Sequence, residues 1–282
     1  MRPQDFELLA RLLKERSGLV VSPEKVYLLE SRLAPVARRF HLDSLDKLAD
    51  ELRYRPTESL LRDVTEAMTT NESFFFRDTT PFDLLQKQIL PMLVNRRAAQ
   101  KRIRIWCAAC STGQEPYSIA MLLNEQKAKW AGWQIEILGT DLSTSVLRRA
   151  QEGIYSQFEV QRGLPIQLMV KYFTQVGDAW QLAKDIRDMV QFRELNLLAS
   201  FSSLGTFDVV FCRNVLIYFD EATKSEVLNR IRQVMPTDGS LILGAAETVL
   251  GICDRFKPVR GARGLYAPSE FVAQAELAAK AS

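Results

Sequence analysis

The chain has 282 residues, of which 47% are hydrophobic and 25% are charged, a balance that excludes a disordered or fibrous chain and allows a substantial core. The formal net charge is +3. Residues 1–76 hold 12 Lys and Arg against 13 Asp and Glu, and the remainder holds 25 against 21, so neither part has the basic excess of a nucleic-acid-binding protein.

The N-terminus lacks the apolar stretch of a secretion signal, and no apolar run approaches the roughly 20 residues that a membrane span needs. Four cysteines are too few for a disulfide framework in a chain of this length, which suits the reducing cytoplasm. We therefore expect a soluble cytoplasmic protein without membrane insertion.

The N-terminal region reads as helices only. Pro3 stands near the start of the first helix, and segment 22–24 (Ser-Pro-Glu) predicts a capped start for the second, with a kink at Pro35. Thr57 is expected to cap a fourth helix. Residues 1–76 are therefore predicted to form an all-helical N-terminal domain.

From about residue 100 the pattern changes to short apolar strands that alternate with helices, which predicts an α/β domain with a mostly parallel sheet covered on both faces. Ser143 and Asp220 are expected to cap two of the helices. The predicted strands are 103–107, 135–139, 207–212 and 240–244, and the helices are 117–126, 143–150 and 220–235.

One stretch, residues 169–194, interrupts the alternation and is expected to form a small β-subdomain insert. Its segments around 180–182 and 189–192 could pair with each other as strands. The α/β domain is taken as 77–270, followed by an Ala-rich tail, 271–282. From Glu270 onward we expect a frayed helix with little to pack against.

The segment 106–115 (WCAACSTGQE) lies where the first predicted strand turns into its helix, the place at which open α/β sheets bind ligands. Its small residues let a ligand approach the main chain, and Gly113 can take backbone angles closed to other residues. Asp141 ends the neighbouring strand, where a carboxylate can accept both ribose hydroxyls or merely cap a helix, although Ser143 is better placed to cap. The loop matches neither a P-loop nor the three-glycine dinucleotide pattern, so a nucleoside without phosphates fits best.

Three long motifs in order resemble the signatures of the chemotaxis receptor methyltransferases, the CheR family: 69–78 (TTNESFFFRD), 111–118 (STGQEPYS) and 211–220 (FCRNVLIYFD). The resemblance extends from the helical N-terminus to about residue 268. It implies a Rossmann-like methyltransferase domain that transfers a methyl group from S-adenosylmethionine to glutamate carboxylates of transmembrane chemoreceptors. The products would be glutamate methyl esters and S-adenosylhomocysteine.

The resemblance also implies roles for individual residues. Arg77 and Tyr218 would lie nearest the methyl transfer. This chain has Ser73 where relatives often carry threonine, and Gln114 where an acid is common, which leaves Glu115 to bind charge. The implied cofactor contacts are Asn71, Ser73, Arg77, Glu115, Asp141, Asn196, Leu197, Asn214 and Val215.

Such a site needs no general base, because a glutamate with an ordinary pKa of about 4.3 is already an anion at neutral pH. Arg77 has the planar fork that binds a carboxylate, and Tyr218 could orient the attacking oxygen by a hydrogen bond. Alternatively, Arg77 could only pair with an acid such as Asp78, and Tyr218 could only pack. Cys107 and Cys110 form a C-x-x-C, but no second pair or nearby histidine completes a metal site.

In the family the N-terminal helices face the acidic methylation region of the receptor, so the stripe Arg32, Arg38 and Arg39 is either a docking surface or a solvated helix face. The β-subdomain of some members grips a receptor C-terminal peptide by strand addition. The connection 175–180 is short here, so we expect that this tether is not used. Two other functions remain open: a methyltransferase of the same fold with a nucleobase or small acid as substrate, and a non-catalytic adaptor that binds the cofactor only structurally.

Overall fold

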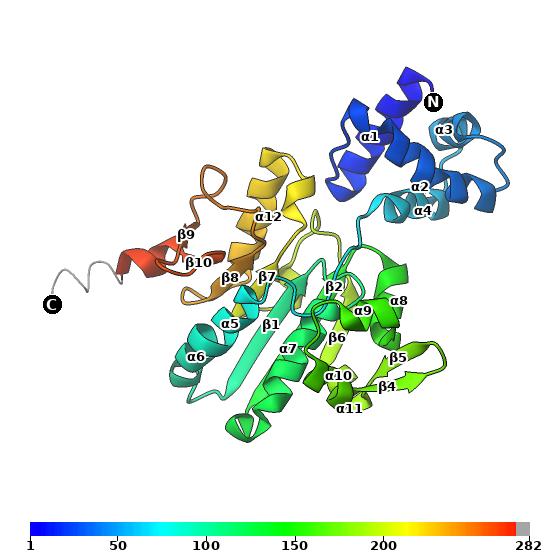
Figure 1. The fold of residues 1–282 in the computed structure, drawn as a ribbon. Helices are drawn as coiled ribbons and strands as arrows, with labels where there is room; N and C mark the ends of the chain where they lie inside the picture. The colour runs from blue at the N-terminus through cyan, green and yellow to red at the C-terminus, as the bar shows by residue number, and fades with distance from the viewer. Residues whose placement is uncertain (275–282) are drawn as a thin grey trace. The chain divides into compact units, whose positions relative to one another are not determined.

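The computed structural model describes residues 1–274 and is drawn in Figure 1. It contains two compact units: a helical unit, residues 1–70 with 218–223, and an α/β unit that begins at residue 71 and takes in the described remainder. The domain limits expected at residues 76 and 270 stay predictions. Most of the expected tail, from residue 275, lies outside the described residues.

The helical unit is built on buried leucine faces, with Leu9, Leu29 and Leu48 fully enclosed. The Thr57 hydroxyl accepts a hydrogen bond from the Leu60 N–H at 3.2 Å, which confirms the predicted cap. The predicted cap at Ser22 is wrong: a short 3₁₀ turn precedes the second helix, and the Ser22 side chain makes no capping bond. The elements are α1 (Pro3–Ser17), η1 (Pro23–Lys25), α2 (Val26–Arg39), α3 (Leu45–Tyr54) and α4 (Glu58–Met68).

Segment 218–223 joins the helical unit through two contacts. The Val20 N–H donates to the Tyr218 carbonyl at 3.0 Å, and Lys14 pairs with Asp220 at 2.7 Å. Asp220 also accepts from the Thr223 N–H at 2.9 Å, which confirms that it caps the helix that follows.

The α/β unit holds a seven-stranded sheet with the order β6-β2-β1-β7-β8-β10-β9. The strands from β6 to β8 are parallel, and β10 runs antiparallel to both β8 and β9. The predicted mostly parallel sheet is therefore confirmed. The strands are β1 (Arg102–Ala108), β2 (Gln134–Asp141), β6 (Val190–Glu194), β7 (Val209–Cys212), β8 (Ser240–Leu243), β9 (Phe256–Pro258) and β10 (Leu265–Pro268).

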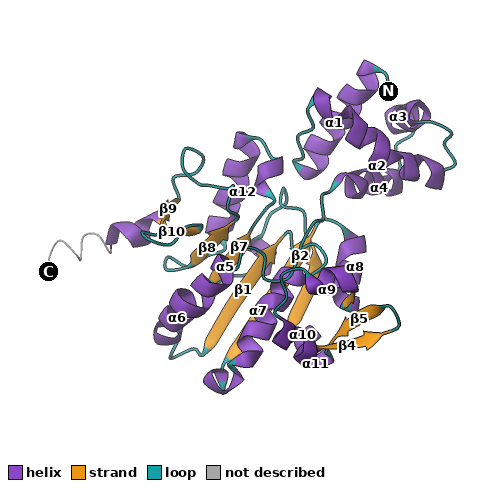
Figure 2. Cartoon of the chain, viewed as in Figure 1, coloured by secondary structure: helices purple, strands orange, loops and turns teal. Residues whose placement is uncertain are grey.

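Helices flank this sheet, with α5, α6 and α7 drawn in front of it (Figure 2). The Ser143 hydroxyl caps α8, as predicted. A π-helical turn, η2, precedes Pro91, whose ring lacks an N–H and leaves one backbone hydrogen bond unmade. The elements are α5 (Thr80–Leu84), η2 (Leu85–Ile89), α6 (Leu90–Arg96), α7 (Gln114–Glu125), η3 (Lys127–Trp130), α8 (Thr144–Glu152), η4 (Ser202–Leu204), η5 (Leu216–Tyr218) and α12 (Glu221–Gln233).

The expected pairing within the insert is wrong. Val190–Glu194 lies in the main sheet beside β2, with Asp141 opposite Glu194. The subdomain is instead an antiparallel sheet of order β3-β5-β4, because the two-residue loop Gly177-Asp178 folds β4 back on β5 and Gly177 takes the positive φ that such a turn needs. Its elements are β3 (Ile154–Ser156), α9 (Gln157–Gln161), α10 (Ile166–Tyr172), β4 (Phe173–Val176), β5 (Ala179–Leu182) and α11 (Lys184–Arg187).

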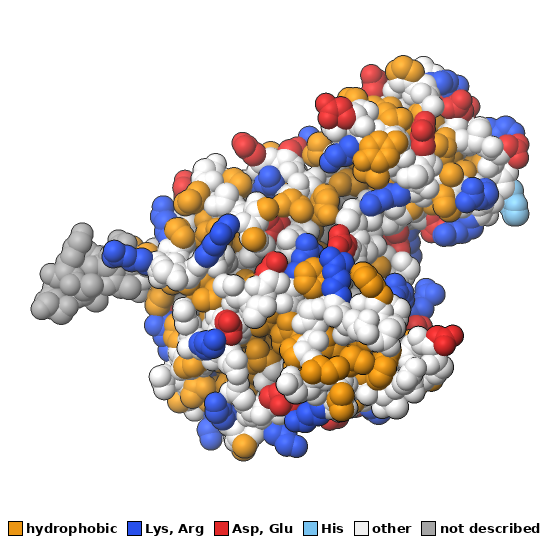
Figure 3. Space-filling view, in the orientation of Figure 1, with side chains coloured by type: hydrophobic (Ala, Val, Ile, Leu, Met, Phe, Trp, Pro, Cys, Tyr) orange, Lys and Arg blue, Asp and Glu red, His pale blue; other side chains and the backbone are white. Residues whose placement is uncertain are grey.

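The chain after β10 also differs from expectation. Glu270 pairs with Arg232, and the Phe271 ring lies 4.6 Å from the Arg96 guanidinium. The start of the predicted tail is therefore anchored to the α/β unit. Acidic and basic side chains are interspersed on the face shown in Figure 3, consistent with the small net charge.

Candidate active site

The carboxyl ends of three parallel strands meet at one edge of the sheet. In the strand register, Ala108 at the end of β1 lies opposite Thr140 of β2 and Cys212 of β7. Loops that follow such strand ends form the ligand crevice of open α/β sheets. The three sequence signatures supply or contact these loops, so the site is built here.

The loop between β1 and α7 has an unusual backbone. Ala109, Ser111 and Gly113 all have positive φ, at 56°, 52° and 90°, and the first two carry side chains that disfavour this region. Such a conformation persists only where its surroundings hold it. The Ser111 N–H donates to Asp141 Oδ2 at 2.8 Å, and its hydroxyl donates to the Asn71 carbonyl at 2.7 Å. The loop therefore links the first signature to the tip of β2.

Asp141 is 6% exposed and lies at the end of β2. Besides Ser111, it accepts a hydrogen bond from the Ser143 N–H at 3.0 Å, while the Ser143 hydroxyl caps α8. Asp141 therefore does not serve as the helix cap.

Glu115 lies in the first turn of α7 and is paired with Arg213, which is itself 6% exposed. The Arg213 Nη1 donates to Glu115 Oε2 at 2.7 Å, while Nη2 donates to the Arg77 carbonyl at 2.9 Å and to Asp78 Oδ2 at 2.7 Å. One guanidinium thus joins all three signatures. Burial raises the pKa of Glu115, although Arg213 opposes this shift.

Within residues 1–274 Arg77 forms no ion pair, although its charge is close enough to Glu72 and Glu115 to favour the ionised form of both carboxyls. Its Nη1 donates to the Glu72 carbonyl at 3.0 Å, and its guanidinium carbon lies 5.4 Å from the centre of the Phe74 ring. Asp78 pairs with Arg213, and no ion pair joins it to Arg77. The alternative in which Arg77 pairs with Asp78 is therefore wrong. Arg162 lies 4.4 Å from the same ring and pairs with Glu72 at 2.6 Å, which helps to fix this segment.

The remaining predicted cofactor contacts follow β6 and β7. The Leu195 N–H donates to the Asp141 carbonyl at 2.9 Å, so Asn196 and Leu197 leave β6 beside the tip of β2. Leu197 is buried at 6% exposure. The N–H groups of Asn214 and Val215 both donate to the Glu247 carboxylate.

Six of the predicted site residues are thus held in pairs by shared partners. Ser111 bonds to Asn71 and Asp141, Arg213 bonds to Arg77 and Glu115, and Glu247 bonds to Asn214 and Val215. Ser73 lies half-buried in the segment between Asn71 and Arg77. Tyr218 belongs to the helical unit and is not among the residues that the α/β unit brings together.

Comparisons with known proteins agree with this geometry. The model of the CheR methyltransferase SAM-binding domain matches residues 71–265, and that of the CheR methyltransferase all-alpha domain matches residues 4–69. The chain belongs to the CheR methyltransferase family. It is therefore an S-adenosylmethionine-dependent methyltransferase, as the sequence predicted.

Similar relatives span almost the whole chain of this CheR family member. It is 38% identical to chemotaxis protein methyltransferase Cher2 of Pseudomonas putida, over 93% of this chain and 96% of the relative. It is 40% identical to chemotaxis protein methyltransferase 1 of Pseudomonas aeruginosa, over the same shares. It is 41% identical to chemotaxis protein methyltransferase 1 of Vibrio cholerae, over 91% of this chain and 94% of the relative.

The donor set of this CheR domain fits S-adenosylmethionine, which carries ribose hydroxyls and an ammonium group but no phosphate. Asp141 offers a buried carboxylate for the hydroxyls. Glu115 accepts from Arg213 and also lies within hydrogen-bond range of the Cys107 thiol, and its buried carboxylate suits an ammonium group. The loop between them presents small side chains where main chain and ligand can approach.

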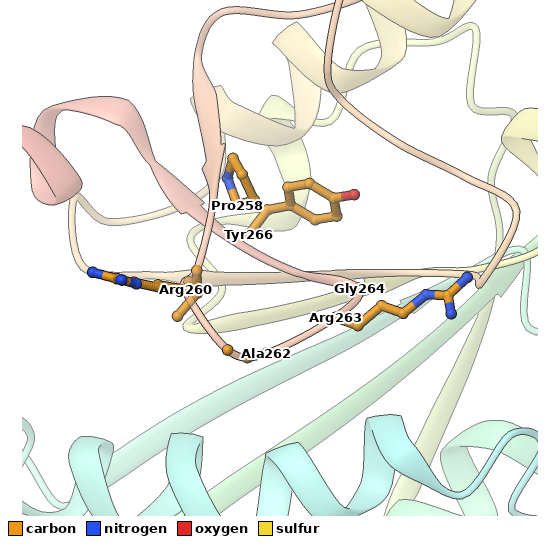
Figure 4. Close-up of a pocket in the computed structure, with 8 residues that line it drawn as sticks. Pro258, Arg260, Ala262, Arg263, Gly264 and Tyr266 are labelled. Atoms are coloured by element: carbon orange, nitrogen blue, oxygen red, sulfur yellow. The ribbon is translucent and has the colours of Figure 1, made fainter.

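Two other features of the chain, the cysteine pair and a cavity at the last hairpin, show no comparable set of functional side chains. Burial raises the pKa of the Cys107 and Cys110 thiols, and residues 1–274 contain no group of histidine, cysteine and carboxylate side chains that could hold a metal ion. An open cavity of about 700 Å³ lies at the β9–β10 hairpin, lined by residues 258–264 and Tyr266. Its Arg260 and Arg263 point in opposite directions, and no signature residue lines it (Figure 4).

Two residues that organise the site were not assigned a role from the sequence. Arg213 stands inside the third signature, and the need to neutralise a buried Glu115 could have identified it. Glu247 follows β8 outside every signature, and its function depends on a contact across 32 residues with Val215 that no local pattern encodes.

Proposed function

We propose that this enzyme methylates glutamate side-chain carboxylates of chemoreceptors, giving glutamate methyl esters and S-adenosylhomocysteine, and that it does so in the cytoplasm. The observation that supports this most is the state of Arg77: within residues 1–274 it forms no ion pair, although its carbonyl is bonded to Arg213, the residue that pairs with Glu115. A guanidinium that forms no ion pair can bind a substrate carboxylate through paired N–H groups. None of the helices in the described part is long and apolar enough to cross a membrane.

The chemistry needs position rather than proton transfer. When bound, S-adenosylmethionine supplies a methyl group on a positively charged sulfur. The substrate carboxylate is ionised at neutral pH, so the protein's task is to align it and exclude water. Aligning two reactants in one site can be worth about 7–11 kcal/mol. Asp141 and Glu115 would hold the cofactor, Arg77 would bind the carboxylate, and Tyr218 would orient the attacking oxygen.

The direct test is transfer of labelled methyl from S-adenosylmethionine to a purified chemoreceptor cytoplasmic fragment. We expect the label to be released by mild base, as methyl esters are, and to be lost when the receptor glutamates are changed to alanine. Label on RNA or on a small acid, or base-stable label on the receptor, would assign a different substrate. A protein that binds cofactor and transfers no label would be an adaptor.

The role of Arg77 can be separated from folding. Arg77→Ala should lower kcat about 100-fold, the order of loss expected when a reactant is misplaced by about 1 Å. Arg102→Ala is the matched control, because Arg102 lies at the opposite end of β1, where it pairs with Glu136. Equal kcat values for the two variants would remove Arg77 from the mechanism.

The receptor surface is proposed to include Arg38 and Arg39 of α2. Arg32 is used internally, since its Nη1 donates to the Met68 and Thr69 carbonyls at 2.8 and 3.1 Å. Arg39 pairs with Asp63, whereas Arg38 is exposed and has no ion pair in the described part of the chain.

Reversal of both charges (R38E, R39E) should raise the KM for receptor severalfold and leave S-adenosylhomocysteine binding unchanged. Reversal of Arg55 and Arg62, exposed on the same unit, is the control. An unchanged KM would exclude this docking surface.

The absence of a receptor tether also stays a proposal. The β4–β5 turn has only the two residues Gly177-Asp178, which supports a short subdomain edge. A peptide from a receptor C-terminus should therefore bind weakly in a titration, and tight binding would contradict this proposal.

A further inference from the structure

A buried carboxylate outside the three signatures holds one wall of the site. Glu247 follows β8 and is 8% exposed. In the described part of the chain it forms no ion pair with any lysine or arginine. Its charge is instead met by four backbone N–H groups.

The four bonds divide evenly between the two carboxylate oxygens. Oε1 accepts from the N–H groups of Val215 and Leu216 at 2.9 and 2.7 Å. Oε2 accepts from those of Asn214 and Gly244 at 2.8 and 2.7 Å. Three consecutive N–H groups after β7 thus donate to one side chain. Because no helix or sheet supplies acceptors for these groups, Glu247 does so.

This arrangement imposes a strained backbone on the third signature. Asn214 has φ of 60°, in the left-handed region, where asparagine is among the better tolerated side-chain-bearing residues. The bonds to Glu247 offset that strain, because hydrogen bonds to an ionised acceptor are stronger than neutral ones. The conformation of Asn214 therefore depends on a residue 33 positions away.

Gly244, which donates the fourth N–H to Glu247, is also closely packed against the loop after β7. A Cβ added to Gly244 would lie 2.7 Å from Glu247 Oε2 and 2.9 Å from Asn214 Nδ2, so only glycine allows the two loops to approach. The Glu247 N–H donates to the Gly244 carbonyl at 3.0 Å, which closes the turn on itself. The Tyr266 hydroxyl lies 3.5 Å from the Glu247 carbonyl and attaches the turn to β10.

We propose that Glu247 is a positioning residue that presets the backbone of residues 214–216 for cofactor binding. The inference rests on the proposed role of Asn214 and Val215 as cofactor contacts. Glu247 itself need not touch the cofactor: it removes the alternative loop conformations that binding would otherwise have to order. The loop is then already formed in the cofactor-free protein.

The first experiment is isothermal titration with S-adenosylhomocysteine. Glu247→Gln replaces one acceptor oxygen by an NH₂ group that faces two N–H donors, so the Kd should rise about tenfold or more. Glu152→Gln, the same change at an exposed residue of α8, should leave the Kd within about twofold of wild type, as for most surface substitutions. Gly244→Ala, which displaces the same carboxylate, should weaken binding in the same direction. Wild-type affinity in Glu247→Gln would overturn the proposal.

A second measurement does not depend on the stability of a variant. In the wild-type protein without cofactor, amide hydrogen exchange of residues 214–216 should be slowed at least about 100-fold relative to an unstructured chain. Exchange at unprotected rates would show that the loop is not preset and would overturn the proposal. If the wild type bound no S-adenosylhomocysteine, the proposed function would fail, while the exchange result would still decide whether the loop is formed without cofactor.

Discussion

The two units bury charge for different purposes. In the described part of the helical unit, Asp5 is the one charged side chain that is buried. It pairs with Arg2, which is the N-cap residue of α1, and with Arg53 of α3. In the α/β unit, four of the buried charges lie at or just beyond the carboxyl ends of strands or in the helix that follows. They are Glu115, Asp141, Arg213 and Glu247.

The partners of these charges differ in kind. Asp5 joins side chains of α1 and α3 and so stabilises a helix packing. The charges of the α/β unit bond to loop backbone instead. Asp141 and Glu247 accept from the N–H groups of Ser111 and Asn214, both of which have positive φ. Arg213 donates to the Arg77 carbonyl. A buried charge that holds loop backbone at a sheet edge therefore indicates a site, whereas one that pairs helices indicates only a fold.

The largest effect should follow loss of the charge that joins the three signatures. Arg213→Met leaves Glu115 without its partner in a buried setting, so the free energy of unfolding should fall by about 3–5 kcal/mol and cofactor binding should be lost. Denaturant unfolding and titration with S-adenosylhomocysteine measure the two effects. A stable variant with normal binding would show that the guanidinium does not organise this edge.

Loss of the buried charge of the helical unit should lower stability without changing cofactor binding. Asp5→Asn weakens the bonds from Arg2 and Arg53 and should lower the free energy of unfolding by about 1–3 kcal/mol. Despite the cost of burial, those bonds hold the pKa of Asp5 below its usual range, so this stabilisation is present above the ordinary pKa and is lost as pH falls through the depressed one. A change in the Kd for S-adenosylhomocysteine would break the distinction between the units.

Cofactor binding to the α/β unit should depend on pH through the charge of Glu115. Burial and the neighbouring Glu247 raise the pKa of Glu115 above that of an ordinary glutamate, while Arg213 and Arg77 oppose this shift. Glu115 should therefore lose its charge at a higher pH than an ordinary glutamate does, and cofactor affinity should fall up to about tenfold per pH unit as the pH drops through that transition. In Glu115→Gln this acid limb should be absent; a limb at the same pH in the variant would assign it to another group.

The smallest effect tests the helix starts of the helical unit. Thr57→Ala removes the cap of α4 and should cost about 1 kcal/mol in unfolding free energy. Ser22→Ala should change it by less than about 0.5 kcal/mol, because that side chain caps nothing. Equal costs would mean that the two hydroxyls act alike in solution.

The sequence predicted the elements whose signal is local. The strands around Ile105 and Ile137 and the caps at Thr57, Ser143 and Asp220 followed from apolar runs and capping residues. The cap at Ser22 failed because Pro23 opened a 3₁₀ turn instead of the helix itself. The insert was misread because Val190–Glu194 looks like any short apolar strand, and its partner is chosen by the whole sheet.

The site shows the same limit. The motif residues could be read from the sequence, and Arg77, Glu115, Asn214 and Val215 do share one connected edge. The residues that hold them could not be read from the sequence, since Arg213 is 98 residues from Glu115 and Glu247 is 31 residues from Leu216. Such partners are fixed by tertiary packing, which spacing in one sequence does not encode.

The central claim is that the buried charges at the sheet edge form the S-adenosylmethionine site. A crystal structure of the complex with S-adenosylhomocysteine tests it most directly. We expect the ribose hydroxyls to bind Asp141 and the ammonium group to bind Glu115, with the backbone of residues 214–216 still bonded to Glu247 as it is here. A ligand bound instead at the hairpin cavity beside Arg260 and Arg263, or a rearrangement of residues 214–216 around the ligand, would show that these buried charges do not form a preset cofactor site.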